Sequence, residues 1–421
     1  MRIALVSYEF PPDTAVGGIA TYSEQVAELL GSAGHSVEVF AASGTRGGTE
    51  ERASYRVHRI HGLDRKTFPD EAAKIFGQRN ALQAFDVVEG PEIWAEARKI
   101  REQYPEVAHV VKLHTPTELV RTANYCKSGI KGWFRHNISQ ARIAAGALWR
   151  GRKPPAYVHR LAAQWLNETE IESIEREYTR ECDLAVAPSQ AMLDWAESNW
   201  SIPSNQRMLV PNPYIPREEL LKVKLRPAGK VIGFMGRLEY RKGIADLVEA
   251  IPQILEADPE VRVRIVGKPL WHPGTVEPFD TYIRRRLRRY MDRVELVGGR
   301  PLAAMPEEYA QIDICIFPSI WENFPNVCLE AMAAGRAVVG STAGGMAEML
   351  RDGAGILIPP HSPQRIAEAA LQFLKSPELR IAAGEKARQT VLDRYSAAAI
   401  LPIVEESYET AIQLNRVRRL N

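Results

Sequence analysis

Two glutamates lie eight positions apart in the second half of the chain, in the segment PSIWENFPNVCLEAMAAG. Glu322 and Glu330 flank a Pro-Asn turn that follows the apolar run Asp313–Phe317. A strand end followed by a helix start offers unpaired N–H groups and a partial positive charge, and an open α/β sheet binds its ligand there. Because a carboxylate accepts from two hydroxyls at once, the acidic pair suits a polyhydroxylated ligand such as a ribose or a hexose. The alternative is a capped helix with Glu330 as an ordinary solvated residue.

A basic loop occurs earlier in the same half, in the segment GFMGRLEYRKG. Gly236 and Arg237 end one predicted strand, and Lys242 and Gly243 begin the next helix. A guanidinium fork and an ammonium point charge at one strand-to-helix loop suit a diphosphate. The alternative is a solvated basic turn.

Two features of the first half also follow predicted strands. Gly17 and Gly18 open a helical pattern, where glycine lets the backbone approach a phosphate. This is not a GxGxxG fingerprint, and no acid follows the second strand to bind an adenosine ribose, so nicotinamide chemistry is disfavoured. His114 follows the predicted strand His109–Leu113, where it can bond a ligand hydroxyl. The alternative is a histidine of the core or the surface.

Short β-rich runs alternate with longer helical patterns, which favours parallel sheets built from βαβ units. The predicted strands are Arg2–Ser7, Ser36–Ala41, Tyr55–Ile60, Asp86–Glu89, His109–Leu113, Asp183–Pro188, Lys230–Met235, Val261–Gly267, Arg293–Val297, Asp313–Phe317, Arg336–Gly340 and Gly355–Ile358. Each half is therefore expected to form its own doubly wound, Rossmann-like α/β sheet.

A chain of 421 residues exceeds the size at which a single core stops growing, so two domains are expected. The Pro-rich stretch Val210–Pro227 disfavours continuous helix and predicts the linker. We expect domains at 1–210 and 211–396, followed by a C-terminal helix at 397–421 that returns to the first domain. A helical pattern runs from about Pro363 to the C-terminus.

Composition excludes several classes of protein. The 54 Lys and Arg residues balance 52 Asp and Glu residues, which gives no support to a nucleic-acid binder. Four cysteines form no CxxC pair, which suits reduced thiols in a cytosolic protein. The N-terminus has no signal-peptide pattern, and no apolar run reaches the ~18 residues of a membrane span. We therefore expect a cytoplasmic protein, soluble or peripheral at the inner face of the membrane.

The motifs above, together with Pro188-Ser189 after a strand, resemble retaining glycosyltransferase family 4. The resemblance implies the GT-B architecture, in which two Rossmann-like domains face each other across a cleft. It covers nearly all of the second half and the first strand-loop-helix of the first half, and it is thin in between. The glutamate pair with its AMAAG flank is highly specific, whereas the glycine pair alone is weak.

The family pattern implies a nucleotide-sugar donor, bound mainly by the C-terminal domain. Arg237 and Lys242 match the positions that bind the diphosphate, and Glu330 matches the acid that binds the ribose hydroxyls. Glu322 matches the acid that faces the transferred sugar. The remaining donor-binding positions implied are Gly17, Gly18, Gly236, Asn323, Phe324, Pro325 and Asn326. His114 matches a histidine that the family often has at a comparable point and joins Glu322, Arg237 and Lys242 as a predicted catalytic residue.

Charge explains how such a reaction proceeds. Departure of the nucleotide leaves negative charge on the diphosphate, which Arg237 and Lys242 would stabilise. The sequence has no Asp-x-Asp pair, so we expect no metal and no cofactor beyond the donor. The resemblance implies retention of anomeric configuration. UDP is the nucleotide we expect first, on its general frequency alone, and GDP and ADP stay open. The alternatives are a GT-B phosphorylase or epimerase and a non-catalytic nucleotide-sugar-binding protein.

The acceptor is a hydroxyl compound that the residues do not identify, and oligomeric state is equally open. Segment 125–160 interleaves basic and aromatic residues, which suits an anionic acceptor or a membrane interface, but a packed insertion with solvated charges is favoured. Five arginines, at 284, 285, 286, 288 and 289, form a second basic cluster. Because their spacing wraps around a helix, a solvated surface is expected there, with a lipid or protein contact as the alternative.

Overall fold

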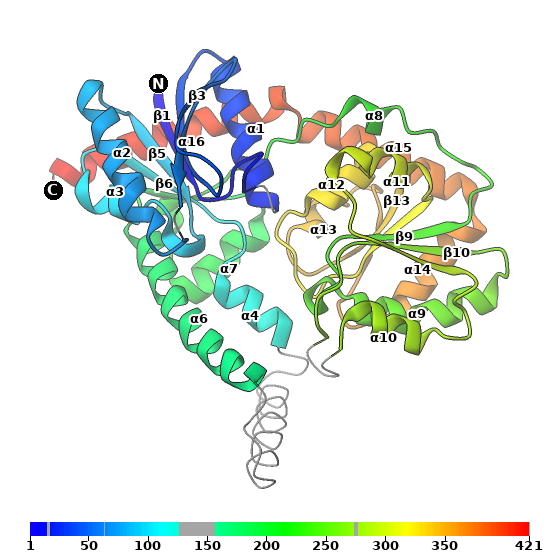
Figure 1. Ribbon diagram of the computed structural model, residues 1–421. Helices are drawn as coiled ribbons and strands as arrows, with labels where there is room; N and C mark the ends of the chain where they lie inside the picture. Colours follow the sequence, from blue (N-terminus) through cyan, green and yellow to red (C-terminus); the bar gives the residue numbers. More distant parts are fainter. Residues whose placement is uncertain (15–16, 63, 126–155, 273–276, 421) are drawn as a thin grey trace, which may run out of the picture. The chain divides into compact units, whose positions relative to one another are not determined.

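The computed structural model describes the chain except for residues 15–16, 63, 126–155, 273–276 and 421 (Figure 1). Two compact units are present. The first comprises Met1–Pro116, Ser173–Ile215 and Val391–Asn421, and the second comprises Thr117–Glu172 and Pro216–Thr390. The units interleave along the chain, whereas the predicted ranges 1–210, 211–396 and 397–421 follow it in order.

The first unit contains an eight-stranded sheet in the order β3-β4-β2-β1-β5-β6-β7-β8. Its strands are β1 (Arg2–Ser7), β2 (Ser36–Ser43), β3 (Gly48–Glu51), β4 (Arg56–His61), β5 (Val87–Pro91), β6 (Ala108–Lys112), β7 (Leu184–Ala187) and β8 (Arg207–Leu209). Neighbours pair in parallel, except that β3 pairs antiparallel with β4 at one edge. In the centre, Ile3 of β1 lies opposite Val37 of β2 and Val87 of β5.

The second unit contains a six-stranded parallel sheet in the order β11-β10-β9-β12-β13-β14. Its strands are β9 (Val231–Met235), β10 (Arg262–Val266), β11 (Val294–Gly298), β12 (Ile314–Phe317), β13 (Ala337–Ser341) and β14 (Ile356–Ile358). β9 and β12 are neighbours, with Ile232 opposite Ile314. The segments that follow these two strands therefore leave the same edge of the sheet.

Helices connect the strands in both units. They are α1 (Gly18–Ser32), α2 (Phe68–Leu82), α3 (Arg98–Gln103), α4 (Thr117–Tyr125), α6 (Ala156–Glu181), α7 (Gln190–Trp200), α8 (Glu218–Leu221), α9 (Ile244–Ala257), α10 (Phe279–Arg286), α11 (Met305–Ala310), α12 (Asn326–Ala333), α13 (Met346–Met349), α14 (Pro363–Lys375), α15 (Pro377–Arg394) and α16 (Ala397–Leu420), with 3₁₀ turns η1 (Ile93–Ala95), η2 (Ser204–Gln206), η3 (Tyr240–Lys242) and η4 (Leu302–Ala304). The predicted C-terminal helical run is thus present as three helices.

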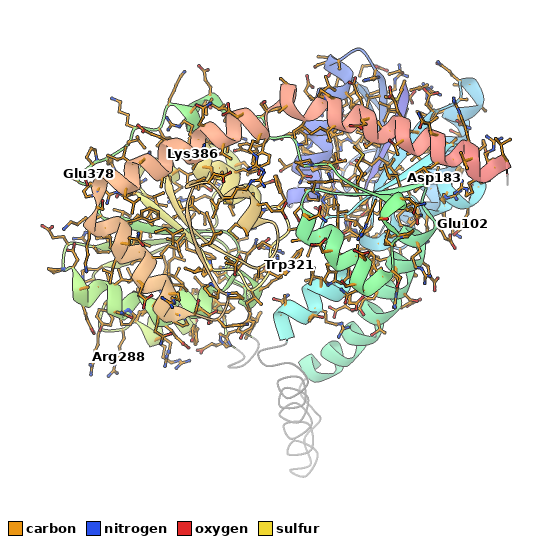
Figure 2. All side chains as sticks on the ribbon, turned by 180° about the vertical axis from the view of Figure 1, so that it is seen from behind. Glu102, Asp183, Arg288, Trp321, Glu378 and Lys386 are labelled. Carbon is orange, nitrogen blue, oxygen red and sulfur yellow. The ribbon has the colours of Figure 1, made fainter. Side chains whose placement is uncertain are left out.

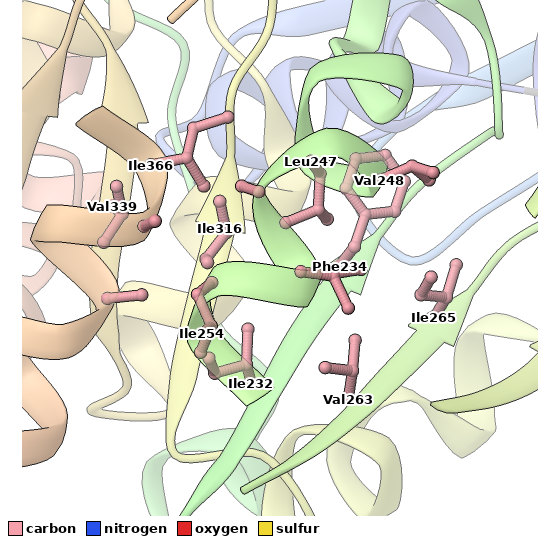
Figure 3. Close-up of a cluster of buried hydrophobic side chains, with 14 of the residues drawn as sticks. Ile232, Phe234, Leu247, Val248, Ile254, Val263, Ile265, Ile316, Val339 and Ile366 are labelled. Atoms are coloured by element: carbon pink, nitrogen blue, oxygen red, sulfur yellow. The ribbon is translucent and has the colours of Figure 1, made fainter. Parts of the chain in front are cut away.

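The core of the second unit explains why its apolar runs form central strands. Phe234 of β9 packs among Leu247 and Val248 of α9, and Ile316 of β12 lies in the same cluster (Figure 3). Ile366 of α14 also belongs to this cluster. Burial of each such side chain stabilises the fold by roughly 1.5–3 kcal/mol relative to exposure. Strands that are apolar on both faces are therefore most stable where helices cover both faces of the sheet.

The C-terminal helix α16 packs into the first unit through apolar and polar contacts. Tyr408 is buried, and its hydroxyl donates to Glu89 Oε2 at 3.0 Å. Asn415 Nδ2 donates to Asp183 Oδ2 at 3.0 Å, and Arg418 Nη1 lies 2.8 Å from Asp183 Oδ1 (Figure 2). The last helix thereby satisfies a buried carboxylate of β5 and the buried carboxylate of Asp183, the residue before β7.

The predicted α/β class with two doubly wound parallel sheets is confirmed. Every predicted strand is present, with ends shifted by at most two residues. The sequence prediction missed β3 and β8, which lie at the two edges of the first sheet. β3 reads GTEE and β8 has only three residues, so neither carries the apolar pattern of a buried strand.

Candidate functional site

The loop after β9 positions the basic residues of the site. Gly236 has φ of +135° and Gly243 has φ of +69°, both in the region that favours glycine. Between them, η3 carries Arg241 and Lys242. The η3 turn is held against the segment after β12, because Ile320 N donates to Arg241 O at 2.8 Å.

Gly243→Ala is expected to lower the free energy of unfolding by about 2 kcal/mol or more. The alanine would be strained by the left-handed backbone conformation, and its Cβ would be too close to neighbouring atoms. A Cβ at this position would lie 1.9 Å from Pro318 O, so the backbone after β12 would have to move. Chemical denaturation measures this change. Gly44→Ala is the matched control: its Cβ would meet no atom within 4 Å, and stability should change by less than about 0.5 kcal/mol. Equal effects of the two substitutions would contradict the packing described for η3.

Glu322 is fixed by the loop after β13. Its N–H donates to Ala343 O at 3.3 Å, and its carbonyl accepts from Gly345 N at 2.9 Å. The side chain is buried and forms ion pairs with Lys242 Nζ and, at 3.1 Å, with Arg241 Nη1. Lys242, which follows β9, and Glu322, which follows β12, are thus in contact within the second unit, as the sequence predicted.

Arg241 is the centre of this cluster, and the sequence interpretation gave it no role. Its guanidinium is buried and also contacts Glu239 Oε1 at 3.0 Å and Trp321 O at 3.2 Å. Its Nε is buried and has no hydrogen-bond partner among the described residues. Arg237 Nη2 lies 3.2 Å from the same Glu239 oxygen, with 59% of its side chain exposed. Three cations and two carboxylates therefore form one network, in which Arg237 presents its charge to solvent.

Electrostatics favour a charged Glu322. Burial raises the pKa of Glu322, but Arg241 and Lys242 more than offset burial, so the pKa lies below its ordinary value. Burial lowers the pKa of Lys242, with Glu322 opposing and Arg241 adding to that effect. The ion pair with Glu322 therefore opposes the effect of burial on the pKa of Lys242.

Glu330 lies apart from the ion-pair network. It is on α12 and partly exposed, and Tyr309 OH donates to its Oε2 at 3.0 Å. Burial of the carboxyl, opposed by Tyr309, raises the pKa of Glu330 to about 7. No ion pair or hydrogen bond among the described residues joins it to Glu322, Lys242 or Arg237.

The turn between the two glutamates leads directly into α12. Asn323 and Phe324 are buried, Pro325 is the N-cap and Asn326 is the first helical residue. The helix start has no side-chain cap. Backbone N–H groups at such a start carry a partial positive charge suited to an anion or a hydroxyl oxygen.

The remaining predicted site residues belong to the first unit. His114 follows β6, and its N–H donates to both carboxylate oxygens of Glu92 at 2.8 Å. Its ring meets Tyr22 edge-on at 5.2 Å, and burial, together with Lys112 and Arg65, lowers the pKa of His114 to about 3. The imidazole is therefore neutral at ordinary pH. Gly17 and Gly18 are exposed at the start of α1.

Sequence reasoning missed Arg241, Glu239 and Glu92. Arg241 and Glu239 belong to the segment GRLEYRKG, which also contains the predicted site residues Arg237 and Lys242. The adjacent Arg241 and Lys242 could have indicated this cluster from the sequence. Two cations in one turn need acidic partners if either of them is buried. The basic and aromatic residues of segment 126–155 lie outside the described residues.

Two features are absent from the part of the chain that the structure describes. No group of three or more His, Cys, Asp or Glu side chains in it is arranged to hold a metal ion. Nor does any of its helices have both the length and the apolar composition that a membrane crossing requires.

Comparison with known proteins covers both halves of the chain. A family model described as "Glycosyltransferase Family 4" matches residues 16–217, and one described as "Glycosyl transferases group 1" matches residues 229–376. D-inositol 3-phosphate glycosyltransferase of Corynebacterium aurimucosum is 27% identical over 98% of this chain and 97% of its own length.

Solved structures share the fold. Sucrose-phosphate synthase from Thermosynechococcus elongatus has a TM-score of 0.70 and 21% identity, covering 97% of this chain and 98% of its own. Anabaena HepE in complex with UDP-glucose has a TM-score of 0.61 and 16% identity, covering 97% of this chain and 100% of its own.

Proposed function

Because the chain is a family 4-like glycosyltransferase of the GT-B class, we propose that it transfers a hexose from UDP to an acceptor hydroxyl with retention of anomeric configuration. The observation that carries this proposal is the contact of Lys242 and Arg241 with the buried Glu322. It sets cationic groups for a diphosphate beside a carboxylate for sugar hydroxyls. HepE, which shares the fold, forms complexes with UDP and UDP-glucose, which supports UDP as the nucleotide.

The proposed roles follow from charge and exposure. Arg237 is exposed and meets the diphosphate first, and Lys242 stabilises the charge that develops on it as the sugar departs. Glu322, ionised and fixed by its backbone, binds hydroxyls of the transferred hexose together with N–H groups at the start of α12. Because Arg237, Arg241 and Lys242 supply positive charge, the proposed reaction uses no metal ion.

For the first unit, we propose that His114, Gly17 and Gly18 can contact a nucleotide-sugar donor. A neutral imidazole can donate to or accept from a sugar hydroxyl but cannot act as a cationic acid. The exposed glycine backbone can approach the phosphates. The described cysteines Cys182, Cys315 and Cys328 are free and buried, which supports a reducing cytoplasmic compartment.

Transfer and its stereochemistry test the proposal directly. The protein is incubated with UDP-, GDP- or ADP-hexoses and a panel of hydroxyl acceptors, and the anomeric coupling of the product is read by NMR. We expect a glycosidic bond with the configuration of the donor, formed with UDP-hexose. A donor at about a hundred times its Kd should also stabilise the fold by about 2.7 kcal/mol in thermal unfolding. Donor cleavage or epimerisation with no new glycosidic bond would favour a phosphorylase or epimerase instead.

Glu330 gives a prediction for pH. If the ionised carboxylate binds the ribose hydroxyls, donor KM should rise as pH falls through the Glu330 pKa of about 7. One unit below the pKa, roughly a tenth of the carboxyls remain ionised, so KM should rise roughly tenfold. Steady-state kinetics of Glu330→Gln should show a raised KM that is constant over this range. A variant whose KM keeps the wild-type pH dependence would contradict the role of Glu330.

A further inference from the structure

A basic segment surrounds α10 in the second unit. Residues 277–293 contain six arginines and three acids, a net charge of +3, whereas the complete chain has a net charge of only +2. Phe279, Tyr282 and Ile283 of α10 are buried, which fixes one face of the helix against the core. The arginines at 284, 285, 286, 288 and 289 are all exposed; the first three are in the last turn of the helix, and the other two are in the turns that follow it.

Four of these arginines, at 284, 286, 288 and 289, form no ion pair with an acid among the described residues. No described carboxylate oxygen lies within 4.0 Å of any of the four, and Arg286 bonds to the hydroxyl of Tyr282. Arg285, by contrast, forms an ion pair with Glu277. Figure 2 shows Arg288 at the outer margin of the second unit, with its side chain directed away from the ribbon. Such cations are available to an anionic partner.

An exposed apolar pair adjoins the arginines. Trp271 is 66% exposed and Leu270 is 39% exposed. Trp271 forms a β-bridge with Pro278, and Phe279 N donates to Leu270 O at 2.9 Å, which holds the pair at the start of α10. Glu277, the ion-pair partner of Arg285, also accepts from His272 N at 2.8 Å through its carbonyl. Trp271 therefore lies at the N-terminal end of α10 and the arginines lie in and just beyond its last turn, along a helix that is only about 12 Å long.

We propose that this surface, the α10 patch (Leu270, Trp271, Arg284, Arg285, Arg288 and Arg289), docks the protein on a bilayer that contains anionic phospholipid. Arginine heads attract anionic headgroups, and tryptophan favours the boundary between headgroups and acyl chains. A soluble polyanion would use the charges but would leave the aliphatic side chain of Leu270 in water. The combination favours a lipid surface over an acidic protein or a nucleic acid.

Vesicle sedimentation tests the α10 patch with the full chain. The probes are vesicles of phosphatidylcholine alone and of phosphatidylcholine with phosphatidylglycerol in about equal amounts, because the attraction requires anionic lipid. Wild type should sediment with the mixed vesicles only. Each arginine near the surface contributes about fivefold to binding, so the triple variant R284S/R288S/R289S should bind about a hundredfold more weakly. Trp271→Ser should weaken binding severalfold and leave the arginine contribution intact.

The matched control removes the same charge elsewhere in the second unit, in the triple variant R351S/R365S/K386S, whose three side chains are exposed. It should bind mixed vesicles like wild type. An equal loss of vesicle binding in both triple variants would show that binding depends only on net charge. Undiminished vesicle binding of R284S/R288S/R289S would show that another part of the chain contacts the membrane. Either result would overturn the proposal, as would binding to heparin or polyglutamate without binding to vesicles. UDP-hexose thermal shifts of R284S/R288S/R289S should match wild type, which separates this surface from the donor site.

Discussion

Lys242→Ala should lower kcat for hexose transfer by about 10²–10³-fold, the loss typical for removal of one group that stabilises developing negative charge. Lys242 is the cation in direct contact with the carboxylate of Glu322, and its side chain is only 15% exposed. In the variant, the departing diphosphate would keep Arg237 but lose the buried ammonium. Steady-state kinetics with saturating donor measures the effect on kcat separately from donor binding.

Lys222→Ala is the matched control for this experiment. Lys222 follows α8 in the same unit, and 68% of its side chain is exposed in an ion pair with Glu218. We expect unchanged kcat and a change in stability below about 1 kcal/mol. Circular dichroism should show that Lys242→Ala remains folded. A folded Lys242→Ala enzyme with wild-type kcat would remove Lys242 from the leaving-group role.

Arg241→Ala should destabilise the protein at neutral pH by about 3–5 kcal/mol, as expected when one partner of a buried ion pair is removed. Its guanidinium contacts both Glu239 and Glu322, and all three side chains are more than nine-tenths buried. Lys242 alone would remain to compensate Glu322. Urea unfolding measures the loss. The matched control is Arg237→Ala, which removes a guanidinium from the same Glu239 oxygen but is 59% exposed, so its effect should stay below about 1 kcal/mol.

The destabilisation of Arg241→Ala should shrink as pH falls. In wild type, the lowered pKa of Glu322 contributes stability above the unfolded-state pKa, and that contribution disappears as pH falls through the folded-state value. In the variant, burial is less opposed, so the pKa of Glu322 should rise and protonation should relieve the buried charge. The difference in unfolding free energy between wild type and variant should therefore be largest near neutral pH. A difference that grows on acidification would contradict this account of the cluster.

Particular residues show how far sequence reasoning reached. The apolar runs that became β9 and β12 were predictable because a strand buried on both faces needs continuous apolar residues. The cluster of Lys242 with Glu322 depends on β9 and β12 being neighbours, which no local pattern specifies. Each residue was placed at a strand end, and the sheet order then brought them together. The family resemblance implied that both residues face one donor, and the structure shows them in contact within the second unit.

What the sequence pattern could not predict was which basic side chain is buried. Arg237 and Arg241 have the same side chain and stand four positions apart in one loop. Arg241 is nevertheless buried in contact with two acids, whereas Arg237 faces solvent. Burial depends on the backbone of η3 and on the positive φ of Gly243, which fix the directions of neighbouring side chains. The interpretation of the five arginines as a solvated ring likewise assumed that the helix continues, whereas α10 ends at Arg286.

A crystal structure of the protein with bound UDP tests the central claim most directly. The account predicts that the diphosphate oxygens lie about 2.7–3.2 Å from the guanidinium of Arg237 and from Lys242 Nζ, with the ribose hydroxyls at hydrogen-bond distance from Glu330. Glu322 should remain free of phosphate and point toward the position of the missing hexose. UDP bound with its phosphates away from both cations would contradict the account.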